Sequence, residues 1–241
     1  MTGQKKLEIL KKTALTNFPE IVLKEDQWLD LEMFKQMDYY AVEQYNLPIE
    51  LMMENAGLNL AILVAKSSDP DADIVIGVGN GNNGGGGLVA ARRLAAWGYK
   101  VFLDMPLAVE QDLPHKQLQR ALDFGVTVDT PHNPGIWVDA YLGFSQRLPL
   151  PQEIANSIKK ANESSALRIS LDLPTGYLGQ GSVDYFNPNK TLILASAKKI
   201  LKEIDSELFV ADLGIPKEVY EKFNSEILPF YNSTILKITK T

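Results

Sequence analysis

Six glycines fall within ten residues of this chain, between a short β-branched segment and a helix-forming segment. Residues 79–88 read GNGNNGGGGL, residues 73–78 before them read DIVIGV, and residues 88–97 at their end read LVAARRLAAW. A strand, a glycine-packed turn and a helix N-terminus together make a place where backbone N–H groups can face an anion. A flexible linker would also be rich in glycine, but linkers rarely lie directly between a strand and a helix. The stretch therefore predicts a strand–loop–helix unit whose loop faces a ligand.

The rest of the chain continues this alternation of strands and helices. Further strands are expected at residues 101–104, 126–128, 136–139, 167–172, 191–194 and 208–211, and helices at residues 117–124, at 151–160 and from 217 through 223. Strands that alternate with helices predict a parallel sheet that is covered on both faces.

Two helices are expected upstream of the glycine stretch, at residues 29–45 and about 49–66, because apolar residues recur there at helical spacing. Within the second helix we expect Glu54 to lie on an exposed polar face and Gly57 to allow close packing. Residues 1–23 are amphipathic and are not assigned. No linker or break in composition divides the 241 residues, which predicts a single domain over 1–241.

The composition argues against several classes of protein. A net charge of −6 gives no indication of a nucleic-acid-binding protein. The absence of cysteine excludes disulfides and thiolate chemistry, and two histidines exclude a histidine-rich metal site. No apolar run approaches the roughly 18–20 residues that span a bilayer, and no signal peptide is apparent. We therefore expect a cytoplasmic protein with neither a membrane nor a nucleic acid as partner.

Polar residues follow three of the expected strands, where an open parallel sheet binds its ligands. One strand ends at the glycine stretch, one at Asp139, and one at residues 172–176, which read DLPTG. Either aspartate alone could be a helix N-cap or a turn former. Asn83, Asp139 and Thr175 are all oxygen donors and would suit a hard cation. Asp172 then remains as a candidate general acid or base.

The glycine stretch also matches a second template. Residues 79–84 fit G-x-G-x-x-G, and Asp104 lies 20 residues beyond Gly84, at the end of the next expected strand. This is the dinucleotide-binding fingerprint with its ribose-binding acid, and it would indicate a nicotinamide-dependent oxidoreductase. It leaves the paired asparagines and the other strand-end motifs unexplained. A P-loop is excluded because no Gly-Lys-Ser/Thr follows the glycines.

Together these motifs resemble the YjeF N-terminal domain family, the NAD(P)H-hydrate (NAD(P)HX) epimerases. The family's glycine motif is roughly G-x-G-N-N-G-G-D-G-L, and its upstream M…D…A and L-M-E-N-A-G patterns are similar to Met37-Asp38…Ala41 and to residues 51–57, which read LMMENAG. Other matches, in family order, are residues 139–143 (DAYLG), 172–176 (DLPTG), 195–198 (ASAK) and 212–216 (DLGIP). The resemblance covers about residues 28–223.

The resemblance implies a Rossmann-like three-layer α/β/α sandwich with a mostly parallel sheet and N-terminal helices. It implies an isomerase that interconverts the R and S forms of hydrated NADH or NADPH, which carry a hydroxyl at C6 of the reduced ring. A partner dehydratase would then repair the S form, and the epimerase would be a homodimer. A potassium ion would be held by Asn83, Asp139 and Thr175, and Asp172 would be the general acid or base. The substrate-binding residues would be Asn82, Asn83, Gly84, Gly85, Gly86, Gly143, Phe144, Ser145 and Asp172.

The chain departs from the family pattern at three positions. Gly86 stands where the family has an aspartate in its substrate-binding segment, and Leu107 stands where some members carry a lysine. Thr175 replaces a serine but keeps the hydroxyl. Because the ion-binding residues and Asp172 are present, we expect a working or weakened epimerase. The alternative from the same fold is a non-catalytic relative, such as the dimerising scaffold domain of an RNA-decapping enhancer.

Overall fold

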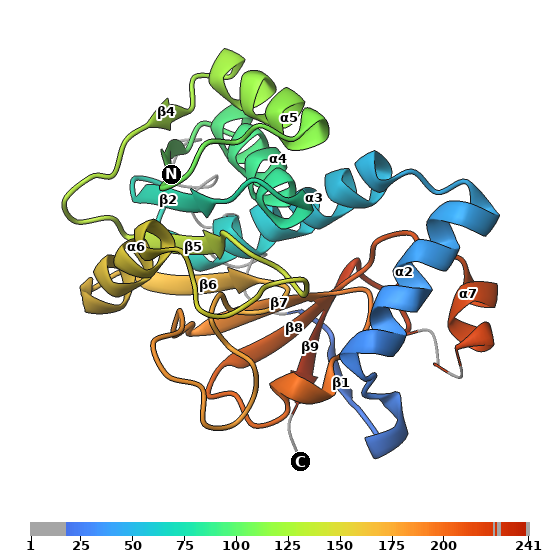
Figure 1. Cartoon of the computed structure of the whole chain (residues 1–241). Coiled ribbons are helices and arrows are strands. Elements are labelled where there is room, and N and C mark those ends of the chain that lie inside the picture. Colours follow the sequence, from blue (N-terminus) through green and yellow to red (C-terminus); the bar gives the residue numbers. More distant parts are fainter. Residues whose placement is uncertain (1–17, 224, 226–227, 240–241) are drawn as a thin grey trace, which may run out of the picture.

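The computed structural model describes residues 18–223, 225 and 228–239. In this part of the chain, nine strands form one sheet in the order β1-β9-β8-β7-β6-β5-β2-β3-β4, with helices around it (Figure 1). Every neighbouring pair is parallel except β8 and β9. The strands are β1 Glu20–Val22, β2 Asp73–Val78, β3 Lys100–Asp104, β4 Thr127–Val128, β5 Ile136–Ala140, β6 Leu167–Leu171, β7 Lys190–Leu194, β8 Glu207–Ala211 and β9 Ile235–Thr239. The helices are η1 Glu25–Gln27, α2 Leu31–Tyr45, α3 Ile49–Ser67, α4 Asn82–Ala96, α5 Asp112–Asp123, α6 Gln152–Glu163, η2 Lys199–Leu201 and α7 Lys217–Lys222.

Both faces of the sheet are buried, as the alternation of side chains along β2 shows. Ile74 and Ile76 belong to a core cluster shared with α3, α4 and α5, whereas Val75 packs on the other face with Trp137 and with Ile154 of α6. A strand alternates its side chains between the two faces, so a strand that is apolar throughout must be covered twice. The expected three-layer α/β/α architecture is therefore confirmed. No helix in the described ranges is both long and apolar enough to cross a membrane.

The glycine stretch is not a loop throughout, which corrects the expectation of a helix that begins at residue 88. Helix α4 begins at Asn82, so the four consecutive glycines lie inside its first turns and are buried. A Cβ on Gly85 would lie 2.5 Å from Cε of Met53, and a Cβ on Gly87 would lie 2.6 Å from Cβ of Ala140. Each glycine costs the helix about 1 kcal/mol relative to alanine. Close packing against α3 and β5 explains why this cost is tolerated.

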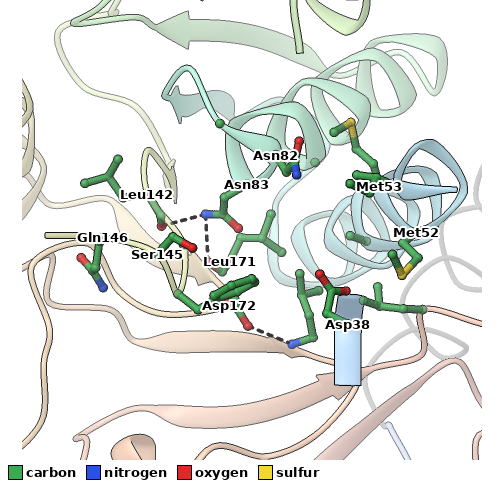
Figure 2. Close-up of a pocket in the computed structure, with 18 of the residues that line it drawn as sticks. Asp38, Met52, Met53, Asn82, Asn83, Leu142, Ser145, Gln146, Leu171 and Asp172 are labelled. Carbon is green, nitrogen blue, oxygen red and sulfur yellow. Dashed lines mark hydrogen bonds between the residues drawn. The ribbon is translucent and has the colours of Figure 1, made fainter. Parts of the chain in front are cut away.

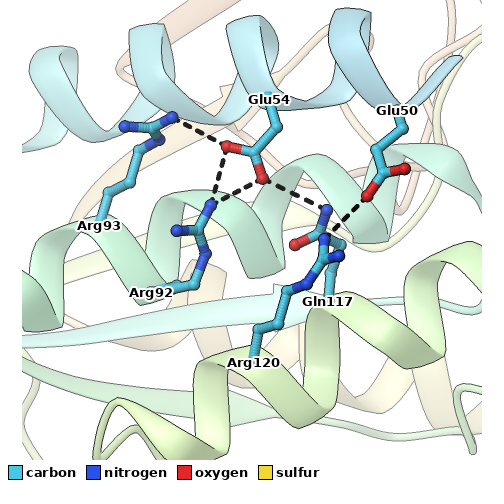
Figure 3. A network of polar contacts seen from close by, with 6 residues as sticks. All are labelled: Glu50, Glu54, Arg92, Arg93, Gln117 and Arg120. Carbon is cyan, nitrogen blue, oxygen red and sulfur yellow. Dashed lines mark hydrogen bonds and ion pairs between the residues drawn. The ribbon is translucent and has the colours of Figure 1, made fainter. Parts of the chain in front are cut away.

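Helices α3 and α4 are also held together by a close contact at Gly57 and by a charged network. A Cβ on Gly57 would lie 2.4 Å from Cβ of Val89, so the close packing expected at Gly57 is confirmed. Glu54 is not simply on an exposed polar face, because it accepts hydrogen bonds from Arg92 at 2.7 Å and Arg93 at 2.8 Å across the helix interface (Figure 3). Gln117 of α5 donates to the same carboxylate at 3.4 Å. Glu54 therefore ties three helices together.

The far edge of the sheet was not expected from the sequence. Strand β9 pairs antiparallel with β8, and β1, from the unassigned N-terminal region, pairs parallel with β9. Residues 1–17 of that region lie outside the described residues. Helix α5 also begins earlier than expected, at Asp112 instead of residue 117. Strands β1 and β9 are short, and they join the sheet by pairing with residues that are not their neighbours in the chain. A local sequence pattern does not reveal such pairing.

Candidate functional site

A pocket of about 400 Å³ opens beside the carboxyl ends of β5 and β6 and the start of α4. The chain order places β3 on one side of β2 and β5 on the other, so the strand order reverses at this point of the sheet. Ligands of open α/β sheets bind at such a switch point. The walls come from α2, α3, the first residues of α4 and the segment 141–146 after β5 (Figure 2). The pocket therefore lies where the three strand-end motifs were expected to meet.

Most of the residues that the family resemblance implies for substrate binding line this pocket. They are Asn82, Asn83, Gly86, Gly143, Phe144, Ser145 and Asp172. Gly84 and Gly85 are not among its lining residues. A Cβ on Gly84 would lie 2.0 Å from the carbonyl oxygen of Gly79, and Gly85 faces Met53. These two glycines pack α4 against its neighbours.

Asp172 forms a buried ion pair with Lys198. The side chain of Lys198 is 0 % exposed and that of Asp172 is 1 % exposed, and the ammonium group donates to Oδ1 of the carboxylate at 2.6 Å. Nζ of Lys198 also donates to the carbonyl of Leu194 at 3.1 Å and lies 3.7 Å from the ring centroid of Phe34. Burial lowers the pKa of Lys198, and the charge of Asp172 opposes that shift. Asp172 also adopts a left-handed backbone conformation, with φ at 67°, which is uncommon for a residue other than glycine.

A second carboxyl group, that of Asp38, reaches the same pocket from α2 (Figure 2). Its pKa is raised to about 6, first by burial and then by the negative charge of Asp172, while the charge of Lys198 works in the other direction. Perturbed carboxyl groups in clefts are frequent at functional sites. Asp38 and Lys198 appeared in the sequence only as motif matches without a role, because their approach to Asp172 depends on the tertiary structure.

The three expected cation ligands gather in one network beside the pocket. Asp139 is fully buried and accepts hydrogen bonds from the hydroxyl of Thr175 at 2.6 Å, from the backbone of Thr175 at 2.8 Å, and from Ser170 and Tyr141. Burial raises the pKa of Asp139 to about 6, and the hydrogen bonds from Thr175 oppose the shift. Leu142 links the network, because its N–H donates to the Thr175 hydroxyl and its carbonyl accepts from Asn83.

This network offers oxygen atoms of the kind that a hard cation binds. The described residues hold no group of three histidine, cysteine or acidic side chains that could bind a metal, so amide, hydroxyl and carbonyl oxygens would have to complete the ligand set. In the structure these groups bond to one another. An ion would therefore replace some of their hydrogen bonds.

Asp104, the expected ribose ligand of the dinucleotide fingerprint, is engaged by the protein itself. Its carboxylate accepts a hydrogen bond from the hydroxyl of Tyr141 at 2.6 Å and another from Thr130 at 3.0 Å. Burial and the charge of Asp104 together raise the pKa of Tyr141 well above its usual value. A ribose hydroxyl would have to displace these partners, which weighs against the oxidoreductase interpretation.

The fold and the pocket define a parallel α/β protein whose ligand site lies at the switch point of the sheet. A family model described as the YjeF-related protein N-terminus matches residues 49–200, and the chain belongs to this family. An NAD(P)H-hydrate epimerase from Rhodopirellula baltica is 30 % identical over 212 residues, covering 80 % of this chain and 86 % of the relative. A bifunctional NAD(P)H-hydrate repair enzyme from Archaeoglobus fulgidus is 34 % identical, covering 73 % of this chain and 39 % of the relative. A crystal structure of the yeast protein ynu0 shares the fold, with a TM-score of 0.80 at 22 % identity over 89 % of this chain and 100 % of that one.

Proposed function

We propose that this protein is an NAD(P)H-hydrate epimerase, an isomerase that interconverts the R and S forms of hydrated NADH or NADPH. The observation that carries the proposal is the buried Asp172 carboxylate in a pocket of about 400 Å³ at the switch point of the sheet. That volume is within the range of small-molecule sites, roughly 300–1,000 Å³. Relatives with this name match most of the chain.

The start of α4 supports the binding of a diphosphate. The first hydrogen bond of the helix runs from the N–H of Gly85 to the carbonyl of Gly81 at 3.0 Å. The N–H groups of residues 82–84 therefore have no partner within the helix, and a helix N-terminus of this kind favours an anion. The diphosphate of the substrate would lie there, with the nicotinamide ring extending toward Asp172.

The chemistry requires a hydroxyl to leave C6 of the ring and to return. The ring nitrogen can stabilise the cation that remains after departure. A carboxyl group protonates the leaving oxygen, and a carboxylate accepts a proton from the returning water. Asp172 lines the pocket and is assigned to this proton transfer.

The family resemblance also motivates a potassium site formed by Asn83, Asp139 and Thr175, with backbone carbonyls of residues 143–149. A bound ion would supply positive charge beside the pocket and stabilise the segment after β5. We extend the proposal to a cytoplasmic homodimer that works with an NAD(P)H-hydrate dehydratase. The bifunctional names of two relatives are consistent with such a functional link.

The test is an epimerisation assay on freshly prepared NADHX. The purified protein is added to one separated epimer, and the approach to the R/S equilibrium is followed by chromatography in potassium and in sodium buffer. We expect faster interconversion than in buffer alone, a further increase with potassium, and no acceleration by Asp172→Asn. If the rate with protein equals the rate in buffer alone, in potassium and in sodium, the epimerase proposal is refuted. NADHX binding without turnover would instead indicate a non-catalytic relative.

A further inference from the structure

Epimerisation at C6 has a requirement that one fixed carboxyl group does not meet. The hydroxyl leaves from one face of the ring and returns to the other face in the opposite epimer. A proton must therefore be delivered on one side of the ring and removed on the other. A single group held on one side can do both only if the ring turns over within the pocket.

Asp172 is held in this fixed way. Its Oδ1 accepts hydrogen bonds from Lys198 at 2.6 Å and from the backbone of Leu194 at 3.4 Å. Within the described ranges Oδ2 accepts no hydrogen bond, and Asp172 lines the pocket. Oδ2 is therefore available to accept a proton from a ligand in the pocket.

Asp38 has the complementary properties. It reaches the pocket from α2, whereas Asp172 follows β6, so the two carboxyl groups belong to different walls of the same cavity (Figure 2). The side chain of Asp38 makes no hydrogen bond within the described part of the chain. The charged groups that act on it are Asp172 and Lys198, and its pKa of about 6 keeps a fraction of it protonated near neutral pH. Two carboxyl groups that share a pocket but differ in their partners can divide the roles of acid and base between them.

We propose that Asp38 is the second proton-transfer group of the epimerase, acting on the face of the ring opposite to Asp172. This inference rests on the proposed function. In one direction, protonated Asp38 gives its proton to the C6 hydroxyl, the C6–O bond breaks, and water leaves. A second water then adds to C6 from the other face and gives a proton to the Asp172 carboxylate. One proton has moved from Asp38 to Asp172, and exchange with solvent restores the starting state; the opposite direction runs these steps in reverse.

The test compares Asp38→Asn with the wild-type protein and with Glu43→Gln, an exposed carboxyl on the same helix. Rates of NADHX epimerisation are measured between pH 6 and pH 8, after subtraction of the uncatalysed reaction. For the wild type we expect kcat to fall as pH rises above about 6, toward tenfold per pH unit, because protonated Asp38 is lost. Asp38→Asn should lower kcat at pH 6 by about 100-fold or more with KM changed less than about threefold, and should remove this pH dependence. Glu43→Gln should match the wild type.

A second readout follows the oxygen atom. Epimerisation by the wild type in H₂¹⁸O should place ¹⁸O at C6 once per inversion, since the C6–O bond breaks. An active wild type together with an Asp38→Asn variant of equal kcat and equal pH profile would overturn the inference while the proposed function stands. Inversion without ¹⁸O incorporation would also overturn it. A wild type that does not epimerise NADHX at all would refute the proposed function itself, and the inference with it.

Discussion

The ion pair of Asp172 and Lys198 is the most sensitive contact of the site at the scale of single residues. Both side chains are fully buried, so removing one charge leaves the other without compensation. We expect Asp172→Ala to lower the free energy of unfolding by about 3–5 kcal/mol. Adding Lys198→Met should recover a large part of that loss, because the ammonium group left without its partner is then removed as well.

Urea unfolding at pH 7 measures the free energy of unfolding of Asp172→Ala and of the double variant with Lys198→Met. The neighbouring Lys199 forms an exposed ion pair with Asp30, with 47 % and 62 % of the two side chains exposed. Lys199→Met is therefore the matched control, and its effect should stay below about 1 kcal/mol. A double variant as unstable as Asp172→Ala would show that the two charges do not compensate each other.

Asp38 affects stability in the opposite direction. Its pKa is about 6 in the folded protein against about 3.9 in an unfolded chain, so its contribution to stability is present at low pH and is lost as pH rises through 6. Asp38→Asn should then raise the free energy of unfolding at pH 8 by about 1–2 kcal/mol, discounted for partial exposure, and by about half as much at pH 5. Unfolding curves at the two pH values measure the difference, and a loss of stability at pH 8 would contradict the prediction.

Gly86 is the residue at which this chain departs from its family, and the structure leaves room there. A Cβ at this position would meet only Cδ2 of Leu171 at 3.2 Å and Cβ of Ala56 at 3.8 Å, and Gly86 lines the pocket. We expect Gly86→Asp to raise kcat/KM for NADHX several-fold by restoring a substrate contact. Gly86→Ala, which adds the Cβ alone, should leave kcat/KM unchanged. Equal kcat/KM values for the aspartate variant and the wild type would mean that this position does not contact the substrate.

Among the elements, helices α3 and α4 are joined by a charged network that has a structural role. Glu54 contacts two arginines and Gln117 with 25 % of its side chain exposed, whereas Glu50 pairs with Arg120 with 45 % of each side chain exposed. Glu54→Ala should lower the free energy of unfolding by about 2–3 kcal/mol, since it leaves partly buried charges unpaired. Glu50→Ala should cost less than about 1 kcal/mol.

Chemical denaturation of both variants tests this ranking, and KM for NADHX should change in neither. Equal losses of stability at the two glutamates would contradict the role given to burial. The network reaches α4 near its C-terminal end, whereas the glycines of its first turns are held by their close packing on Met53 and Ala140, where helix propensity is poor.

At the scale of the whole molecule, the sheet edge formed by β8, β9 and β1 contributes to the hydrophobic core, but its strands do not line the pocket. Leu236 of β9 is fully buried in a cluster with Leu208 and Val210 of β8. Strands β8 and β7 lie between it and β6, and no residue of β9 lines the pocket. Leu236→Ala should lower the free energy of unfolding by about 2–5 kcal/mol and leave KM for NADHX unchanged. Lys237→Ala, on the opposite side of the strand, is the control, and a changed KM for Leu236→Ala would show that this edge and the pocket are coupled.

The sequence by itself determined the alternation of strands and helices, the parallel sheet and the meeting of three strand-end motifs, because these follow from apolar periodicity and from residue types at fixed spacing. The tertiary structure alone decided what the glycine stretch is. Its last four glycines lie within α4, where Met53 and Ala140 leave no room for a side chain at Gly85 and Gly87. It also decided that Lys198 and Asp38 lie near Asp172, because helix α2 and the segment after β7 are distant in sequence and are brought together only by the fold. Local patterns carry propensity and spacing, whereas burial and charge pairing depend on what the rest of the chain brings nearby.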